Sequence, residues 1–355
     1  MTAPKLDLVE LGWDDSWREL ASAYLQTGEV GRVVRVDKTL CTVVTASGPV
    51  RASYGASILD AVAADVCAAP CTGDWCVVRH WADGPTTVEA VLERRTAVVR
   101  AASSGASTGQ VLVANVDVLA AVVALHPEPN LSRIERLVTL AWESGGRPVV
   151  VLTKADLAAD AQLLAADVRV SAPGVDVIVC STVTGEGIAD VRALVDGNLT
   201  VGLLGASGHG KSSLTNALVG AEVLTTKQIR DDGKGRHTSV RRELVPLPGG
   251  GAVIDTPGLR GVGLQEATEG LASTFPDIEA LVERCRFNDC SHEGEPGCAV
   301  QTAVAEGTLA ERRLDSWRRL RREMVWMASR TDARLRKEQL KKWKAITKHN
   351  RSFRR

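Results

Sequence analysis

Gly205-Ala-Ser-Gly-His-Gly-Lys-Ser212 is the stretch that decides the fold of this chain. It matches the pattern G-x-x-x-x-G-K-[ST] and stands between a run that predicts a strand (200–204) and a segment that predicts a helix. The glycines let backbone N–H groups curl around a phosphate, and the N-terminus of the helix adds partial positive charge. We expect Lys211 to bridge the β- and γ-phosphates of a nucleotide and Ser212 to bind Mg²⁺. The alternative is a structural glycine-rich turn. The residues predicted here to bind nucleotide are Gly205, Ser207, Gly208, Gly210, Lys211, Ser212 and Ser213.

Thr153-Lys-Ala-Asp156 follows the apolar run 148–152 and resembles N-K-x-D, the element with which GTPases recognise guanine. A carboxylate at Asp156 can accept hydrogen bonds from N1–H and the 2-amino group of guanine, whereas adenine would leave it unpaired. The stem of Lys154 is expected to lie over the base, and Thr153 stands where Asn is usual. The alternative is a turn at the end of a strand with a helix cap.

Two further loops complete the set of GTPase motifs. Ser181 follows the next apolar run and resembles the loop that supports the base. Asp255-Thr-Pro-Gly258 matches D-x-x-G, so Asp255 is expected to hold Mg²⁺ through water and the N–H of Gly258 to sense the γ-phosphate. Ordinary GTPases place the phosphate loop first and the base loop last. Here the base loop comes first, which predicts a circular permutation.

Strand and helix patterns alternate from Gln110 to Ile254, which predicts a mostly parallel sheet covered by helices. We assign this α/β P-loop GTPase domain to residues 105–268. The expected strands are 111–116, 148–152, 175–179, 200–204 and 251–254, and the expected helices are 131–144, 158–168, 188–194 and one that begins at Lys211.

Short β-rich runs separated by turn signals fill residues 31–100. About five short strands in this length fit a small closed β-barrel, of which the oligonucleotide/oligosaccharide-binding (OB) type is one candidate. We assign the barrel to residues 31–104. Residues 1–30 are an N-terminal extension, in which Trp13 and Trp17 lie on an expected short helix.

The segment between the phosphate loop and D-x-x-G (227–242) is polar and contains glycine, which is typical of a switch loop. We choose Thr238 as the hydroxyl that completes the Mg²⁺ shell, with Ser239 second. Many GTPases carry Gln after D-x-x-G to orient the attacking water, but Leu259 stands there and cannot hydrogen-bond to water. His237 is the nearest polar candidate for that role. The alternative is an exposed loop histidine.

A cysteine- and histidine-rich loop lies near the C-terminal end. Three thiolates and one imidazole, closely spaced, suit a closed tetrahedral Zn²⁺ site that leaves no position for water, so its role is structural. The alternative is free cysteines near a histidine. The predicted ligands are Cys285, Cys290, His292 and Cys298. A second trio lacks a nearby fourth ligand, and we expect free, packed thiols at Cys67, Cys71 and Cys76.

The chain has 355 residues, of which 45% are apolar and 24% charged, and this composition excludes a disordered or fibrous chain. The apolar stretch 111–125 is interrupted by Asn115 and Asp117, so we expect no membrane span. The N-terminus lacks the pattern of a secretion signal, and clustered cysteines without such a signal indicate a reducing compartment. We therefore expect a cytoplasmic protein, acting as a monomer.

A formal net charge of zero conceals a strong asymmetry. From Glu311 to Arg355 there are 17 Lys and Arg against 5 Asp and Glu. A basic tail on an acidic body suggests an anionic partner, with nucleic acid first. The alternative is a solvated basic helix.

Together these residues closely resemble the RsgA/YjeQ family, the ribosome small-subunit-dependent GTPase A of bacteria. The resemblance rests on the permuted order of T-K-x-D, phosphate loop and D-x-x-G, on Gly235-Arg-His-Thr238, and on the cysteine-rich stretch from Phe275 to Val300. It covers roughly residues 28–345. It implies an OB barrel, a permuted GTPase domain and a helical zinc-binding domain with a basic tail (269–355).

In function, the resemblance implies a GTPase that acts late in maturation of the small (30S) ribosomal subunit. The family binds near the decoding centre, so 16S rRNA and GTP or GDP are the expected partners, and the subunit stimulates hydrolysis. The family assigns hydrolysis to the switch-loop histidine, which is His237 in this sequence.

Two other classes of function remain open from the sequence. One is an RNA-binding module in which bound guanine nucleotide is mainly structural. The other is an ATP-using P-loop kinase, against which Asp156 argues. Acceleration of GTP turnover by small subunits, and competition by guanine over adenine nucleotides, would separate these classes.

Overall fold

The expected parallel sheet is present in the computed structural model, which describes residues 7–100, 109–224, 242–256 and 268–331. Neighbouring strands of this sheet are parallel, except that β12 pairs with β13 in antiparallel fashion. The strands run in the order β10 (Asp176–Val179), β9 (Arg147–Thr153), β8 (Val118–Ala124), β11 (Thr200–Leu204), β13 (Ala252–Asp255) and β12 (Glu243–Pro246).

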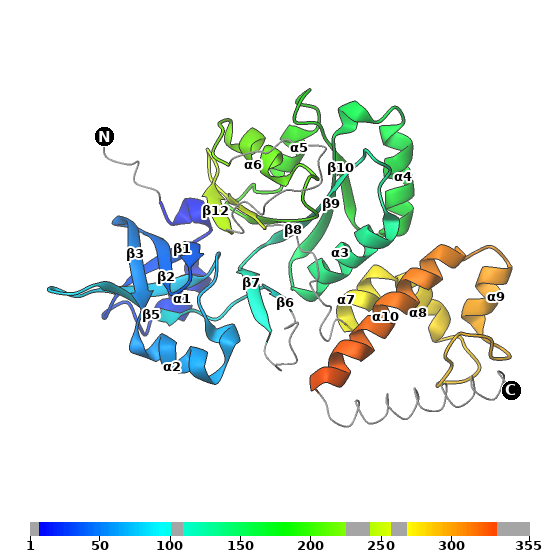
Figure 1. Ribbon diagram of the computed structural model, residues 1–355, viewed down its shortest axis with the longest axis horizontal. Coiled ribbons are helices and arrows are strands. Elements are labelled where there is room, and N and C mark those ends of the chain that lie inside the picture. Colours follow the sequence, from blue (N-terminus) through cyan, green and yellow to red (C-terminus); the bar gives the residue numbers. More distant parts are fainter. Residues whose placement is uncertain (1–6, 101–108, 225–241, 257–267, 332–355) are drawn as a thin grey trace, which may run out of the picture.

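Helices cover both faces of the sheet (Figure 1). Helices α3 (Leu131–Glu143) and α4 (Ala161–Ser171) lie on one face, and α5 (Ile188–Ala193) and α6 (Lys211–Val219) on the other. A central strand such as β8 is therefore buried along its whole length and reads as a continuous apolar run. Its alternate residues divide between the two faces: Leu119, Ala121 and Val123 toward α3 and α4, and Val118, Ala120 and Val122 toward α5 and α6.

One expected strand is present but lies outside the parallel sheet. The sequence predicts 111–116 as a strand of the parallel sheet, but β7 (Gln110–Ala114) instead pairs with β6 (Ala97–Arg100) in a separate two-stranded sheet. Asn115 has a left-handed backbone with φ of +53°, which ends β7 and lets the chain turn into β8. Two consecutive strands thus lie inside one apolar stretch, and the second of them enters the central sheet.

The N-terminal barrel is confirmed, and its five strands close on themselves. The order is β1-β2-β3-β5-β4, and β1 also pairs with β4. Helix α2 (Ala56–Ala64) follows β3, and β3 is parallel to β5. The barrel joins the central sheet where Arg35 of β1 pairs with Glu243 of β12. The strands are β1 (Glu29–Asp37), β2 (Leu40–Thr45), β3 (Gly48–Tyr54), β4 (Trp75–His80) and β5 (Thr86–Val91).

The N-terminal extension packs between the barrel and the central sheet. Trp17 lies on α1 (Asp15–Ala21), as expected, and is buried near Trp75 of β4, with ring centroids 6.1 Å apart. Arg32 is completely buried and donates hydrogen bonds to the carbonyl oxygens of Leu11, Gly73 and Asn115. One guanidinium therefore links the extension, the barrel and the turn between β7 and β8.

The C-terminal helices pack beside α3 (Figure 1). Arg313, at the start of α10, is buried and forms ion pairs with Glu135 of α3 and Asp277 of α8. Glu135 is fully buried, so this contact fixes the C-terminal helices to the domain of the central sheet. The helices are α7 (Thr268–Thr274), α8 (Pro276–Val282), α9 (Ala299–Ala305) and α10 (Glu311–Thr331).

Among the described residues, the longest helices are too polar or too short to cross a membrane. The domain limits at residues 30, 104 and 268 stay predictions.

Candidate nucleotide-binding site and metal centre

The phosphate loop joins β11 to α6 in a turn that requires glycine. A Cβ at Gly205 would lie 2.3 Å from the carbonyl oxygen of Val122, so no side chain fits there. Gly208 and Gly210 have φ of +85° and +84°, which glycine adopts without strain. The loop therefore packs closely against β8 and leads directly into the N-terminus of α6.

Lys211 is buried at the start of α6. Its ammonium donates to the carbonyl oxygens of Gly205 and Ala206, at 3.0 and 3.1 Å. Burial lowers the pKa of Lys211, and the nearby carboxylate of Asp255 partly offsets this effect. The side chain thus lies folded over the phosphate loop, where it can contact a bound phosphate.

Ser212 and Asp255 meet beside the phosphate loop, although 43 residues separate them in sequence. The hydroxyl of Ser212 donates to Oδ2 of Asp255 at 2.7 Å. The other carboxylate oxygen, Oδ1, is buried and has no hydrogen-bond partner among the described residues. A hydroxyl and an unsatisfied carboxylate oxygen are the kind of ligands that Mg²⁺ prefers, so these residues fit that ion.

Thr153 connects the base loop to the phosphate loop. Its hydroxyl donates to the carbonyl oxygen of His209 at 2.8 Å. A side chain that replaces Asn therefore still fixes the two loops to each other. The next residue, Lys154, adopts a left-handed backbone with φ of +59°, and this conformation starts the short 3-10 turn that carries Asp156.

Asp156 is oriented by Ser181 from the loop after β10. The Ser181 hydroxyl donates to Oδ1 of Asp156 at 2.5 Å. The hydroxyl oxygen of Ser181 in turn accepts from the backbone N–H groups of Val183 and Thr184, at 3.1 and 3.2 Å. These bonds fix the hydroxyl, which in turn fixes the carboxylate. Ser181 thus acts on the predicted guanine-binding group by holding it in place.

His209 contributes contacts to the site that the sequence did not predict. Its carbonyl accepts from Thr153, and its ring nitrogen Nδ1 lies 3.2 Å from the carbonyl oxygen of Val122. Burial lowers the pKa of His209, and the cations Arg133, Lys211 and Lys154 lower it further, against the opposing contact with Val122. These surroundings therefore favour the neutral form of the ring.

The structure brings together four of the predicted elements: the phosphate loop, the base loop, Ser181 and Asp255. Three predicted residues, His237, Thr238 and Gly258, lie outside the described residues.

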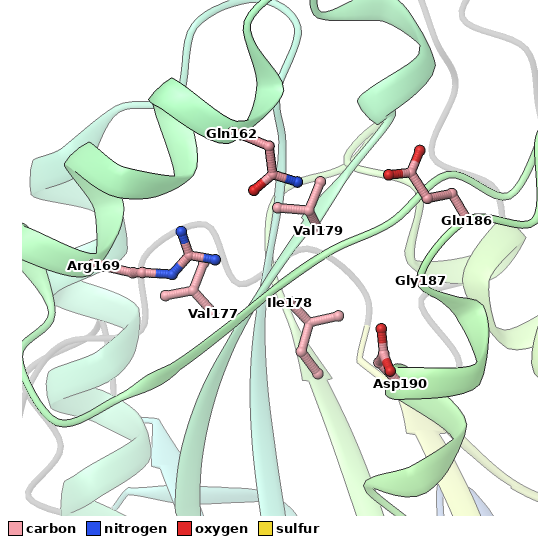
Figure 2. A pocket seen from close by; sticks show the side chains of 8 residues that line it. All are labelled: Gln162, Arg169, Val177, Ile178, Val179, Glu186, Gly187 and Asp190. Carbon is pink, nitrogen blue, oxygen red and sulfur yellow. The ribbon is translucent and has the colours of Figure 1, made fainter.

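A separate cavity of about 380 Å³ opens along β10, the edge strand of the sheet. Figure 2 shows Gln162 and Arg169 of α4 on one side of it, and Glu186 and Asp190 on the other. No predicted nucleotide-binding residue that the structure describes lines this cavity. We therefore locate the nucleotide by the phosphate and base loops.

The four predicted zinc ligands form one cluster, with all ligand atoms within 4.8 Å of one another. Nδ1 of His292 lies 3.5 Å from Sγ of Cys285 and 3.6 Å from Sγ of Cys298. Cys290 completes the set. Burial disfavours the Cys285 thiolate, but N–H groups of Val300 and Ala299 at the start of α9 favour it, and the net pKa is lowered. Three sulfurs and one nitrogen at this spacing fit a tetrahedral Zn²⁺ ion.

Neighbouring side chains that the sequence analysis did not select hold His292 in place. His292 has a left-handed backbone with φ of +62°. Its carbonyl oxygen accepts from Nε2 of Gln301 at 2.6 Å and from the guanidinium of Arg318. The ring packs edge-on against Trp317, with centroids 5.6 Å apart. The imidazole is thus fixed with Nδ1 toward the sulfurs.

Comparison with known proteins identifies similar chains. The family model described as RsgA GTPase matches residues 91–265. The small ribosomal subunit biogenesis GTPase RsgA of Streptomyces coelicolor is 50% identical over 342 residues, which are 95% of this chain and 92% of that protein.

Solved structures show the same architecture. The crystal structure of YjeQ from Thermotoga maritima is 25% identical, with a TM-score of 0.62, and the match covers 84% of this chain and 98% of that one. The structure of YloQ, described as a circularly permuted GTPase, is 23% identical, with a TM-score of 0.55 over 85% and 96% of the two chains. The permuted GTPase fold that the motif order predicts is therefore confirmed.

Proposed function

The chain belongs to the RsgA family of GTPases, and from this premise we propose that it hydrolyses GTP on the small ribosomal subunit, as a checkpoint late in assembly. GTP favours docking in this proposal, and hydrolysis on a matured site releases the protein. We take the small subunit as the partner from similar proteins such as that of Streptomyces coelicolor, which is a small ribosomal subunit biogenesis GTPase.

The choice of a guanine nucleotide rests on one observation, the hydrogen-bonded link between the base loop and the phosphate loop. Asp156 is held by Ser181, and the same base loop is tied to the phosphate loop through Thr153 and the carbonyl of His209. A nucleotide that fills the phosphate loop is therefore presented to a fixed carboxylate. Guanine offers that carboxylate two donors, whereas adenine offers none at these positions.

Hydrolysis needs charge neutralisation at the phosphates and an oriented water. Ser212 and Asp255 would hold Mg²⁺, which when bound neutralises charge on the β- and γ-phosphate oxygens. Lys211 leaves its two loop carbonyls to donate to the same phosphates. We assign the orientation of the water to His237 and the switch hydroxyl to Thr238, and the N–H of Gly258 to contact with the γ-phosphate.

The Cys/His cluster takes a structural role in this proposal. Cys285, Cys290, His292 and Cys298 would hold one Zn²⁺ ion with no open position. The ion would tie the loop after α8 to the start of α9, in a region with little other regular structure. Because Trp317 and Arg318 of α10 contact His292, the zinc-bound loop would support the helix that begins the basic tail, and this tail would meet 16S rRNA.

The proposal also covers the basic tail, the cellular compartment and the oligomeric state. The excess of Lys and Arg after residue 311 suits phosphate contacts with rRNA and predicts an affinity that falls with salt. We propose a cytoplasmic monomer, since one chain carries every motif that the site requires.

The test is GTP turnover with and without purified small subunits, with large subunits as the matched control. We expect acceleration by small subunits alone, loss of turnover in Lys211→Ala, and loss of the stimulated rate in His237→Ala. If turnover does not respond to small subunits, or if subunit affinity is the same in GTP and GDP, the nucleotide has only a structural part. Full stimulated turnover in His237→Ala would remove that residue from the chemistry.

A further inference from the structure

The β4–β5 hairpin carries an indole ring at its tip that the nucleotide site does not use. The hairpin projects from the barrel away from the central sheet (Figure 1). Its last paired residues are His80 and Thr86, and Trp81 follows directly in the connecting turn. Trp81 is 45% exposed, although a tryptophan side chain gains free energy from burial.

The exposed ring is held rigidly. The indole N–H of Trp81 donates to Oγ1 of Thr87 across the hairpin at 2.8 Å, and that hydroxyl donates to Glu89 at 2.5 Å. The guanidinium of Arg79 lies 4.0 Å from the ring centroid. A ring fixed in this way loses little conformational entropy when a flat partner stacks on it. A lone exposed hydrophobic residue needs no explanation, but the hydrogen bond and the stacked cation orient this ring, and an oriented ring favours contact with a flat partner.

The chemistry of the ring and its surroundings selects the partner. Residues 31–104 carry eight Lys and Arg against seven Asp and Glu, so the barrel offers little net attraction to phosphates. Its contribution to RNA binding must then come from contacts other than charge. An indole with a stacked guanidinium is the kind of platform on which unpaired nucleobases stack, and the loop between the fourth and fifth strands is one that OB barrels use for such ligands.

We propose that Trp81, with Arg79 behind it, is a stacking platform for one unpaired nucleobase of the small-subunit rRNA. This inference rests on the proposed function, because that function supplies the RNA. It adds a contact that recognises single-stranded RNA by stacking and is distinct from the salt-dependent contacts of the basic tail.

The test measures the affinity of the full chain for purified small subunits, with a non-hydrolysable GTP analogue, at several KCl concentrations. Stacking is worth about 1–3 kcal/mol per base, so Trp81→Ala should weaken binding about 5- to 150-fold. Trp81→Phe keeps a ring and should stay within about threefold of the wild type. The control is Leu59→Ala on α2, which removes a comparably exposed apolar side chain (51%) and should change nothing.

Salt dependence separates stacking from charge. The slope of log affinity against log salt should be the same for Trp81→Ala and the wild type, since no phosphate contact is lost. Equal affinity of Trp81→Ala and the wild type, or equal weakening in Trp81→Phe and Trp81→Ala, would overturn the proposal.

A cross-link identifies the class of partner. A photo-reactive Trp81→p-benzoylphenylalanine variant, irradiated on the subunit, should label rRNA. Labelling of a ribosomal protein instead would contradict the proposal. GDP affinity should be unchanged in Trp81→Ala, which shows that the protein is folded. If the wild type itself fails to bind subunits, the proposed function fails, whereas binding that ignores Trp81 refutes only this inference.

Discussion

Thr153→Val removes one hydrogen bond from the nucleotide site and changes almost nothing else. Valine matches threonine in shape but cannot donate to the carbonyl oxygen of His209, which now lies 2.8 Å from the threonine hydroxyl. The carbonyl would then lose its partner in a partly buried position. A lost bond of this kind costs about 1 kcal/mol, rising to about 2 kcal/mol when the remaining group stays unsatisfied.

That free energy should appear in GDP affinity, because the base loop must be positioned before Asp156 can meet guanine. A cost of about 1–2 kcal/mol corresponds to binding weakened about 5- to 30-fold. Isothermal titration calorimetry with GDP and Mg²⁺ measures this directly. The matched control is Thr153→Ser, which keeps the hydroxyl and should stay within about threefold of the wild type.

Two outcomes would contradict a positioning role for the Thr153 hydroxyl. If Thr153→Val binds GDP as tightly as the wild type, the bond to His209 does not position the base loop. If Thr153→Ser is weakened as much as Thr153→Val, the methyl group rather than the hydroxyl carries the effect.

Three further changes test other parts of the structure. Asp156→Asn should weaken GDP binding about 100-fold, because charge-assisted hydrogen bonds worth about 3 kcal/mol are lost. It should improve binding of xanthosine diphosphate (XDP), whose 2-oxo group accepts a hydrogen bond from the new amide. Calorimetry with both nucleotides measures the two affinities, and an unchanged preference for GDP would contradict the role of Asp156. Arg313→Met should lower the free energy of unfolding by about 3 kcal/mol, because Glu135 stays buried and, of its two ion-pair partners in the described residues, keeps Arg312 alone. Denaturant unfolding of the double variant with Glu135→Met should recover part of this loss. A loss under about 1 kcal/mol would contradict a stabilising buried ion pair. Cys290→Ala should reduce the zinc content below one ion per chain, as measured by elemental analysis, and should leave the affinity for GDP unchanged. A full zinc content would show that the Cys290 thiolate is not a ligand.

The motifs of the nucleotide site could be read from the sequence because each one is local. The phosphate loop needs glycine where Gly205 approaches β8 and where Gly208 and Gly210 take positive φ. These requirements fix the spacing of the glycines along the sequence. The cysteine and histidine spacing around residue 290 is equally local, and the structure gathers the four ligand atoms. The order of the motifs was enough to predict the permutation.

Contacts between distant segments could not be read in this way. The sequence showed Thr153 only as a departure from Asn, and the bond to His209 depends on how β9 and β11 lie in the sheet. The assignment of 111–116 to the parallel sheet failed because β7 and β8 are both apolar and only the turn at residues 115–117, where Asn115 has a positive φ, separates them. The part of Arg32 was also hidden, since its three carbonyl partners come from segments far apart in the chain.

The central claim is that segments in permuted order form one pocket that selects guanine nucleotides. Calorimetric titration of the wild-type chain with GDP and with ADP, both with Mg²⁺, tests it most directly. We predict one-site binding of GDP and no measurable heat from ADP. Equal binding of the two nucleotides, or no heat from GDP in folded protein, would contradict it.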